Sequence, residues 1–158
     1  QSYPHILRRD AIRASENTFS HPWNPQSEIT GSHLSSLAGL KRTGLSLVRI
    51  PAGKESFAYH LHHREEEWIY ILAGRGIALI DGNEYELGPG GFVAFPTPSV
   101  PHNLRNPGED ELVYMMGGEK LDFEVADFPT LDKRMITLGS EVEIYKLSDS
   151  RPFDKPDS

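Results

Sequence analysis

Short apolar segments, separated by runs rich in glycine, proline, asparagine and aspartate, follow one another along the middle of the chain. Segments of this length and spacing predict β-strands joined by tight turns, and Asp81-Gly82-Asn83 has the composition of a hairpin turn. We expect about eight to ten strands, with scarcely any helix, which predicts an all-β sandwich or barrel. The expected strands are residues 33–38, 45–50, 56–62, 67–73, 77–80, 84–87, 92–95, 102–106 and 111–116, continued by 123–126 and 142–147.

The chain of 158 residues is long enough for one domain with a sizeable core. We expect residues 1–30 to form an N-terminal arm, because the prolines of the sequence HPWNP interrupt regular structure. Residues 31–148 are the expected barrel, and residues 149–158 a short, flexible C-terminal extension. Such an arm covers a sheet edge of its own barrel or of a neighbour, with Trp23 as its anchor. We therefore expect a homodimer.

The charge balance excludes some classes of partner. The chain has 16 Lys and Arg against 23 Asp and Glu, and the net charge of −7 repels nucleic acid phosphates and anionic membrane surfaces. No apolar run reaches the ~18 residues of a membrane span. Without cysteine the chain has neither a disulfide nor thiolate chemistry, and the cytoplasm is the expected location. We expect a small-molecule ligand, and no nucleic acid or membrane partner.

Two histidines and a glutamate lie at a spacing that suits metal binding. His60 and His62 are two residues apart, so on a strand both imidazoles leave the same face. Glu67 opens a second apolar strand that can lie beside the first, and imidazole with carboxylate suits zinc, iron, manganese, nickel or copper. The same run could form a solvated, charged loop, as such runs usually do. The other histidines have no supporting spacing and are expected at the surface or in structural hydrogen bonds: His5, His21, His33 and His63.

The sequence around these residues resembles the first signature motif of the cupins. His60-x-His62 is followed by four residues, Glu67, six residues and Gly74. The motif usually has five residues between its first glycine and its first histidine, whereas six separate Gly53 from His60. The histidines and the glutamate therefore carry more of the resemblance than Gly53 does.

A later segment resembles the second cupin motif. Five residues separate Gly90 from Pro96, and three separate His102 from Asn106. The family normally has glycine two residues after the proline, where this chain has Pro98, and one residue fewer before the histidine. The two motifs in the expected order are more specific than either one alone.

The resemblance, which covers residues 45–116, implies a double-stranded β-helix, the jelly-roll barrel of the cupins. It also implies one divalent transition metal, such as Zn, Mn, Fe or Ni, inside the barrel. Three histidines and one glutamate would leave two positions open on a six-coordinate ion, and a substrate can bind there. The implied metal ligands are His60, His62, Glu67 and His102.

Such a centre favours a metal-dependent enzyme acting on a small polar metabolite. The best interpretation is a sugar or sugar-phosphate isomerase, because cupins of this type are similar to the barrel of phosphomannose isomerases. Glu65 or Glu66, if turned inward, could then carry the proton. The alternatives are a cupin dioxygenase with the same metal site and a cupin that binds a small molecule without turnover. A phosphorylated ligand would need a cation, and the nearest basic residues in sequence are Arg49, Lys54, Arg75 and Arg105.

Overall fold

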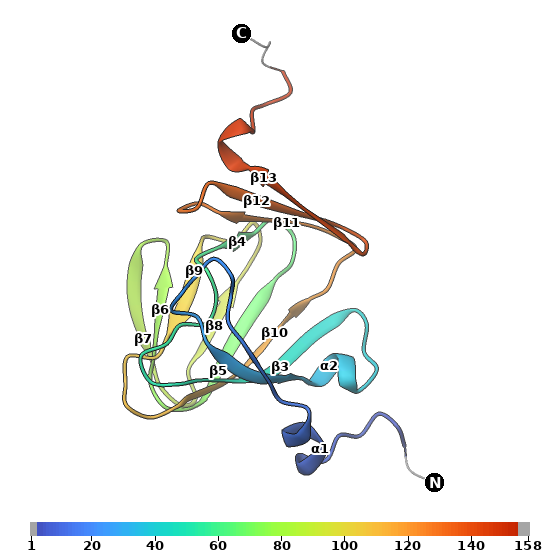
Figure 1. The fold of residues 1–158 in the computed structure, drawn as a ribbon, viewed down its shortest axis with the longest axis vertical. Coiled ribbons are helices and arrows are strands. Elements are labelled where there is room, and N and C mark those ends of the chain that lie inside the picture. Colours follow the sequence, from blue (N-terminus) through green and yellow to red (C-terminus); the bar gives the residue numbers. More distant parts are fainter. Residues whose placement is uncertain (1–2, 155–158) are drawn as a thin grey trace.

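The computed structural model describes residues 3–154 and is built almost entirely of antiparallel β-strands (Figure 1). The short helical elements are α1 (Arg9–Ala14), α2 (Leu34–Leu37) and the 3-10 turn η1 (Leu147–Asp149). The strands are β1 (Asn17–Phe19), β2 (Ile29–His33), β3 (Thr43–Ile50), β4 (Leu61–His62), β5 (Glu67–Ala73), β6 (Gly76–Ile80), β7 (Asn83–Leu87), β8 (Phe92–Phe95), β9 (His102–Arg105), β10 (Leu112–Glu119), β11 (Phe123–Phe128), β12 (Lys133–Leu138) and β13 (Glu141–Lys146).

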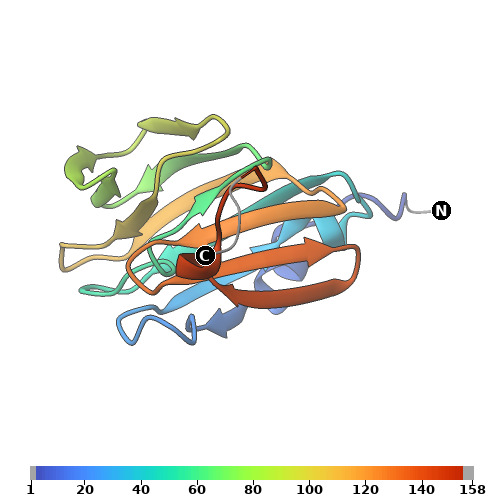
Figure 2. The ribbon, with the colours of Figure 1, turned by 90° about the horizontal axis from the view of Figure 1, so that it is seen from above.

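The strands form three sheets. The largest has the order β1-β2-β3-β10-β5-β8, the second β13-β12-β11-β4, and the third β7-β6-β9. The second sheet lies at the top of Figure 1, and Figure 2 looks down on its strands β11, β12 and β13, which run side by side across the molecule. The all-β prediction is confirmed.

The main core lies between the six-stranded and the three-stranded sheets. Alternate residues of β3 are buried, as expected of a strand with one face on the core, and β10 shows the same alternation at its start, where Leu112 and Tyr114 are buried. A second, smaller cluster lies under β11, where Trp23 packs against Phe128. The buried apolar residues of the main core are Ile29, Val48, Ile50, Ile69, Ile71, Ala78, Phe95, Leu104, Leu112 and Tyr114.

Residues 33–38 were predicted as a strand, and this is wrong: their central part is helix α2. The chain has to reverse here, because β2 and β3 pair with each other in antiparallel register. The side chain of Ser35 accepts a hydrogen bond from the Leu45 backbone N–H at 2.9 Å and so ties the helix to the start of β3. Apolar spacing in so short a segment does not distinguish a helical turn from a strand.

The predicted strand 56–62 is mostly irregular, and only its last two residues, β4, pair in a ladder, with β11. At the start of this segment, a side chain provides hydrogen bonds in addition to the backbone. Asn103 Oδ1 accepts hydrogen bonds from Ser56 Oγ at 2.8 Å and from the Phe57 N–H at 3.4 Å. Further along, His60 makes an isolated bridge with His102.

The segment expected to be an arm extends the six-stranded sheet of its own chain. Strand β1 pairs with β2, and β2 pairs with β3. Trp23 packs edge-on against Phe128 with ring centroids 4.9 Å apart, and Lys133 Nζ lies 5.1 Å above the Trp23 ring. Trp23 therefore has partners within its own chain, and the homodimer stays a prediction that sedimentation can test.

Part of the flexible extension expected at residues 149–158 lies outside the described residues, since these end at 154. Among residues 3–154, no helix is both long enough and apolar enough to cross a membrane.

The motif glycine Gly74 lies where the chain turns from β5 to β6, with a φ of +83°. A Cβ there would lie 2.3 Å from the Glu111 carbonyl oxygen, and backbone cannot move aside as a side chain can. Gly53 also has positive φ, +77°, but no atom lies within 4 Å of its Cβ position.

We expect Gly74→Ala to lower the free energy of unfolding by about 2–5 kcal/mol, and Gly53→Ala by about 1–2 kcal/mol.

Urea denaturation of the two variants measures this difference, because both carry the same unfavourable φ and only one adds the steric clash. Equal losses in the two variants would contradict the prediction.

Candidate metal centre

Four side chains from separate parts of the barrel converge at one end of the interior. Glu67 is the first residue of β5, His62 the last of β4 and His102 the first of β9. His60 lies opposite His102, because each backbone N–H donates to the carbonyl of the other residue, at 3.2 and 2.9 Å. The irregular chain before β4 is therefore tied to β9 at the point where the two imidazoles meet.

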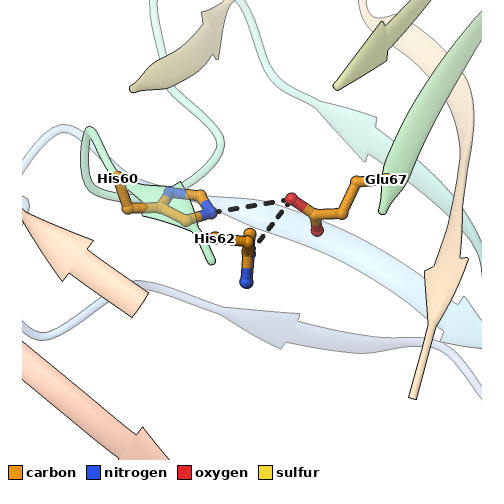
Figure 3. A group of neighbouring side chains, drawn as sticks. All are labelled: His60, His62 and Glu67. Atoms are coloured by element: carbon orange, nitrogen blue, oxygen red, sulfur yellow. Dashed lines mark ion pairs between the residues drawn. The ribbon is translucent and has the colours of Figure 1, made fainter. Parts of the chain in front are cut away.

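Figure 3 shows the imidazoles of His60 and His62 beside the Glu67 carboxylate, and His102 lies near the same carboxylate oxygen. Glu67 Oε1 lies 3.1 Å from His62 Nε2, 3.3 Å from His102 Nε2 and 3.9 Å from His60 Nε2. His60, His62 and Glu67 also form a group whose candidate ligand atoms all lie within 4.8 Å of one another. The Glu67 side chain is 21 % exposed, so a small ligand can reach the cluster.

Backbone carbonyls and aromatic rings fix two of the imidazoles. His60 Nδ1 lies 2.7 Å from the Ala58 carbonyl, and His102 Nδ1 lies 2.9 Å from the Val100 carbonyl. A carbonyl can only accept, so each Nδ1 carries the hydrogen, and in a neutral ring Nε2 presents a lone pair. The Phe95 ring stacks on His102 with centroids 3.6 Å apart. Both Nε2 atoms are thereby held toward Glu67.

The electrostatics of the cluster fit a bound cation. Burial, followed by the nearby charges of His102 and His62, lowers the pKa of His60 to about 4, so this ring is neutral at neutral pH. Burial raises the pKa of Glu67, but hydrogen bonds and charges from the histidines outweigh burial and hold it well below its usual range. The lone pair of the neutral His60 ring thus faces an anionic oxygen, which is unfavourable unless a positive charge lies between the two atoms.

The distances between the candidate ligand atoms also fit a bound metal ion. Ligand atoms bound to one transition metal at 2.0–2.2 Å lie roughly 3 Å apart or slightly more. The separations of 3.1 and 3.3 Å from Glu67 Oε1 to His62 and His102 are close to that spacing, and the 3.9 Å to His60 is longer. The residues present therefore fit a divalent metal.

The far side of His62 faces two further carboxylates. His62 Nδ1 lies 3.6 Å from Glu124 Oε2 and 3.9 Å from Glu65 Oε1 and has no hydrogen-bond partner among the described residues. Burial lowers the pKa of His62, but the hydrogen bond to Glu67 and the charges of the glutamates outweigh burial and raise it. A carboxylate behind a metal-binding imidazole orients the ring and increases its basicity.

Backbone N–H groups hold these two carboxylates in place. Glu124 is buried and accepts hydrogen bonds from the N–H of Arg64 at 3.0 Å and of Val125 at 2.6 Å. Glu65 accepts one from the Leu121 N–H at 2.8 Å. Burial raises the pKa of Glu65, the Leu121 hydrogen bond lowers it, the charge of Glu124 raises it again, and the net direction is upward.

The two glutamates proposed to carry a proton thus lie in different places. Glu65 lies behind His62, whereas Glu66 is exposed and belongs neither to the group of His60, His62 and Glu67 nor to that of His62, Glu65 and Glu124.

We expect Glu65→Gln to weaken metal affinity by about tenfold or more, because the supporting carboxylate is lost, and Glu66→Gln to leave it unchanged. Competition with a fluorescent chelator measures both. Because the two variants lose the same charge, equal weakening would contradict an orienting role for Glu65.

The remaining histidines lie outside the cluster. His63 Nε2 is 2.7 Å from Asp127 Oδ2, and His33 Nδ1 is 2.9 Å from Ser46 Oγ. His5 Nδ1 is 2.7 Å from the Ala38 carbonyl. His21 lies against the ring of Phe128, and burial lowers its pKa.

One cavity adjoins the centre, and a second, larger cavity shares Phe57 and Met116 with the first. The inner one has a volume of about 30 Å³ and is lined by His60, Glu67, His102 and Tyr114 among others. Tyr114 is 1 % exposed, and its hydroxyl has no hydrogen-bond partner among residues 3–154. The outer cavity, of about 390 Å³, lies against the strands β1, β2 and β3. Sequence reasoning identified neither Tyr114 nor Glu124, because both look like ordinary strand residues.

Comparison with known proteins identifies a family model, a curated relative over part of the chain and a solved structure over almost all of it. A family model described as the cupin domain, Cupin_2, matches residues 46–118. The crystal structure of a protein named as a candidate sugar phosphate isomerase, from Acidithiobacillus ferrooxidans, is 33 % identical. It superposes with a TM-score of 0.90 over 96 % of this chain and 98 % of that one. A curated but uncharacterised protein of Methanocaldococcus jannaschii is 34 % identical over 70 residues, and the match spans only 54 % of its length.

More distant structures share the fold. A protein of Silicibacter pomeroyi, named as a sugar phosphate isomerase from a cupin superfamily, is 20 % identical, with a TM-score of 0.76 over 88 % of this chain and 90 % of that one. A predicted oxalate decarboxylase of Thermotoga maritima is 21 % identical, with a TM-score of 0.63 over 73 % of this chain and 99 % of that one. These likenesses confirm the jelly-roll barrel expected from the sequence. The chain belongs to the cupin superfamily, with a domain of the cupin 2 type that the family model matches at residues 46–118.

Proposed function

We propose that this protein is a metal-dependent enzyme that acts on a small hydroxy-carbonyl compound of the sugar class and interconverts its isomers. One observation carries the proposal: three imidazole Nε2 atoms lie around Glu67 Oε1, with two of the rings fixed by backbone carbonyls. The relative from Acidithiobacillus ferrooxidans, which matches along almost its whole length, supports the sugar class through its name.

The proposed metal ligands are His60, His62, Glu67 and His102, and the proposed cofactor is one divalent ion of Zn, Mn, Fe or Ni. When bound, such an ion acts as a Lewis acid toward a carbonyl or hydroxyl oxygen. The chain supplies the rest. Ala58 and Val100 hold two imidazoles in one tautomer, and barrel residues exclude bulk water from the inner cavity.

Tyr114 is the side chain best placed to act on a ligand oxygen. Its hydroxyl is buried, unpaired among the described residues and part of the inner cavity wall beside Glu67. Burial and the charge of Glu67 raise the pKa of Tyr114, so the hydroxyl remains a hydrogen-bond donor at neutral pH. A donor aimed at an oxygen that gains negative charge during enolisation stabilises that charge.

A dioxygenase is the second candidate, and the size of the inner cavity favours it. A volume of about 30 Å³ accommodates an oxygen-bearing molecule little larger than water. The same four residues would serve this reaction. A cupin that binds its ligand without turnover uses the same site as well.

One experiment separates the three functions. The metal-loaded protein is incubated with a panel of aldoses and ketoses in D₂O, while an electrode follows dissolved oxygen. An isomerase exchanges the proton next to the carbonyl, so deuterium appears at that carbon in the NMR spectrum, and oxygen is not consumed. Oxygen uptake without exchange would favour the dioxygenase. Ligand binding with neither signal would favour the binding protein.

A further inference from the structure

The outer cavity is large enough for a substrate, and it shares lining residues with the inner cavity, which His60, Glu67 and His102 line. Small-molecule sites begin at roughly 300 Å³, and this cavity has about 390 Å³, whereas the inner cavity has about 30 Å³. Phe57 and Met116 line both cavities, so the two are neighbours. Met116 is an unbranched, adaptable side chain, which suits a partition that a ligand can displace.

The wall of the outer cavity combines apolar surface with uncharged polar groups. Aromatic and aliphatic side chains provide the apolar part, including Phe19, Val48 and Phe57. Hydroxyl, amide and imidazole groups provide the polar part, and His33 Nδ1 already pairs with Ser46 Oγ at 2.9 Å. This composition suits the apolar ring faces and the hydroxyls of an uncharged sugar. The polar members are Asn17, Thr18, Ser32, His33 and Ser46.

No lysine or arginine lines either cavity among the residues that the structure describes. The arginines closest in sequence to the site are engaged elsewhere, and Arg64, which lies between His62 and Glu67, donates to the Phe123 carbonyl at 2.7 Å. Arg49 pairs with Glu16 at 2.9 Å and Glu111 at 3.0 Å, and Arg105 pairs with Glu84 at 3.0 Å. Arg75 pairs with Glu86 as well. A phosphate group in this site would lack the cationic partner that usually binds it.

The metal centre itself is rich in negative charge. Three carboxylates surround His62: Glu67 Oε1 is 3.1 Å from Nε2, and Glu124 and Glu65 lie 3.6 and 3.9 Å from Nδ1. Carboxylates so close to the centre disfavour a phosphate dianion there, and an uncharged ligand does not meet this repulsion.

We infer that the substrate of this centre is an uncharged hydroxy-carbonyl sugar held in the outer cavity, and not its phosphate ester. The inference rests on the proposed function and narrows it. The inferred substrate therefore differs from the sugar phosphates that the names of two similar structures mention.

Matched pairs of ligands test the inference. The full chain is loaded with Mn²⁺, and calorimetry measures the affinities of glucose, mannose, fructose and ribose, each with its terminal monophosphate. We expect at least one free sugar to bind, and to bind on the order of tenfold more tightly than its ester. An ester that binds as tightly as its sugar, or more tightly, overturns the inference but leaves the sugar function standing. Absence of binding by every compound overturns both.

A positive charge added to the outer cavity provides a second test of the inference. Thr18 is exposed and lines the outer cavity, whereas Thr43 is exposed and lines neither cavity. We expect Thr18→Lys to tighten binding of the phosphate ester by about tenfold relative to binding of the free sugar, measured as the ratio of the two affinities. Thr43→Lys makes the same change in net charge and should affect neither ligand. Equal responses in the two variants would show that overall charge governs affinity, against the inference.

Discussion

Replacing His62 or His102 by alanine is expected to abolish stoichiometric metal binding. Each substitution removes one of the three nitrogens near Glu67 Oε1, at 3.1 and 3.3 Å respectively, and leaves that carboxylate without a close imidazole on one side. The two variants and the wild type are stripped with a chelator and reloaded with Mn²⁺ or Zn²⁺, and metal per chain is measured by plasma mass spectrometry. The wild type should bind one ion per chain, and each variant far less than one.

His63→Ala is the matched control, because it removes an imidazole next to the centre that points elsewhere. His63 Nε2 lies 2.7 Å from Asp127, away from the cluster. This variant should keep its metal, and circular dichroism should show that all variants retain the β-rich fold. A full complement of metal in the double variant of His62 and His102 would overturn the assignment of the centre.

Local sequence signals were sufficient for the strands that carry the strongest patterns. Strand β5 begins and ends at the predicted residues 67 and 73, because an apolar run bounded by a charged segment and a glycine has few other conformations. The hairpin of β6 and β7 follows from Asp81-Gly82, where φ is +49° and +81°. The motif spacing also predicted which side chains lie together. His60 forms a bridge with His102 at the start of β9, and this bridge places the two imidazoles side by side.

Tertiary context decided the rest. Strand β12 was not predicted, and it holds its place between β11 and β13 through pairing on both sides. Its Arg134 donates to Asp127 at 2.7 Å, a contact between strands that no local pattern contains. Glu124 lies far from His62 in the sequence and faces it only because β11 pairs with β4. Long-range pairing therefore determines the groups around the metal ligands, while local pattern determines the ligands themselves.

Tyr114→Phe is expected to separate catalysis from stability. A buried hydroxyl without a partner costs free energy, so its removal should leave the free energy of unfolding unchanged or raise it slightly. Loss of a hydrogen-bond donor to the developing charge should instead lower kcat by about 10²-fold, with little change in KM. Chemical denaturation and steady-state kinetics on the best sugar of the panel measure the two effects.

Tyr70→Phe is the control for the same chemical change, because Tyr70 lies on β5 but is 37 % exposed. It should alter neither kcat nor stability. If Tyr114→Phe instead destabilises the protein and leaves kcat unchanged, the hydroxyl has a structural partner and no part in the reaction. The expected result is a slower enzyme with an equally stable barrel. It would mean that the Tyr114 hydroxyl, although it costs stability when buried without a partner, acts on the ligand. Polar groups that are unsatisfied in the free protein are expected where a ligand completes their hydrogen bonds.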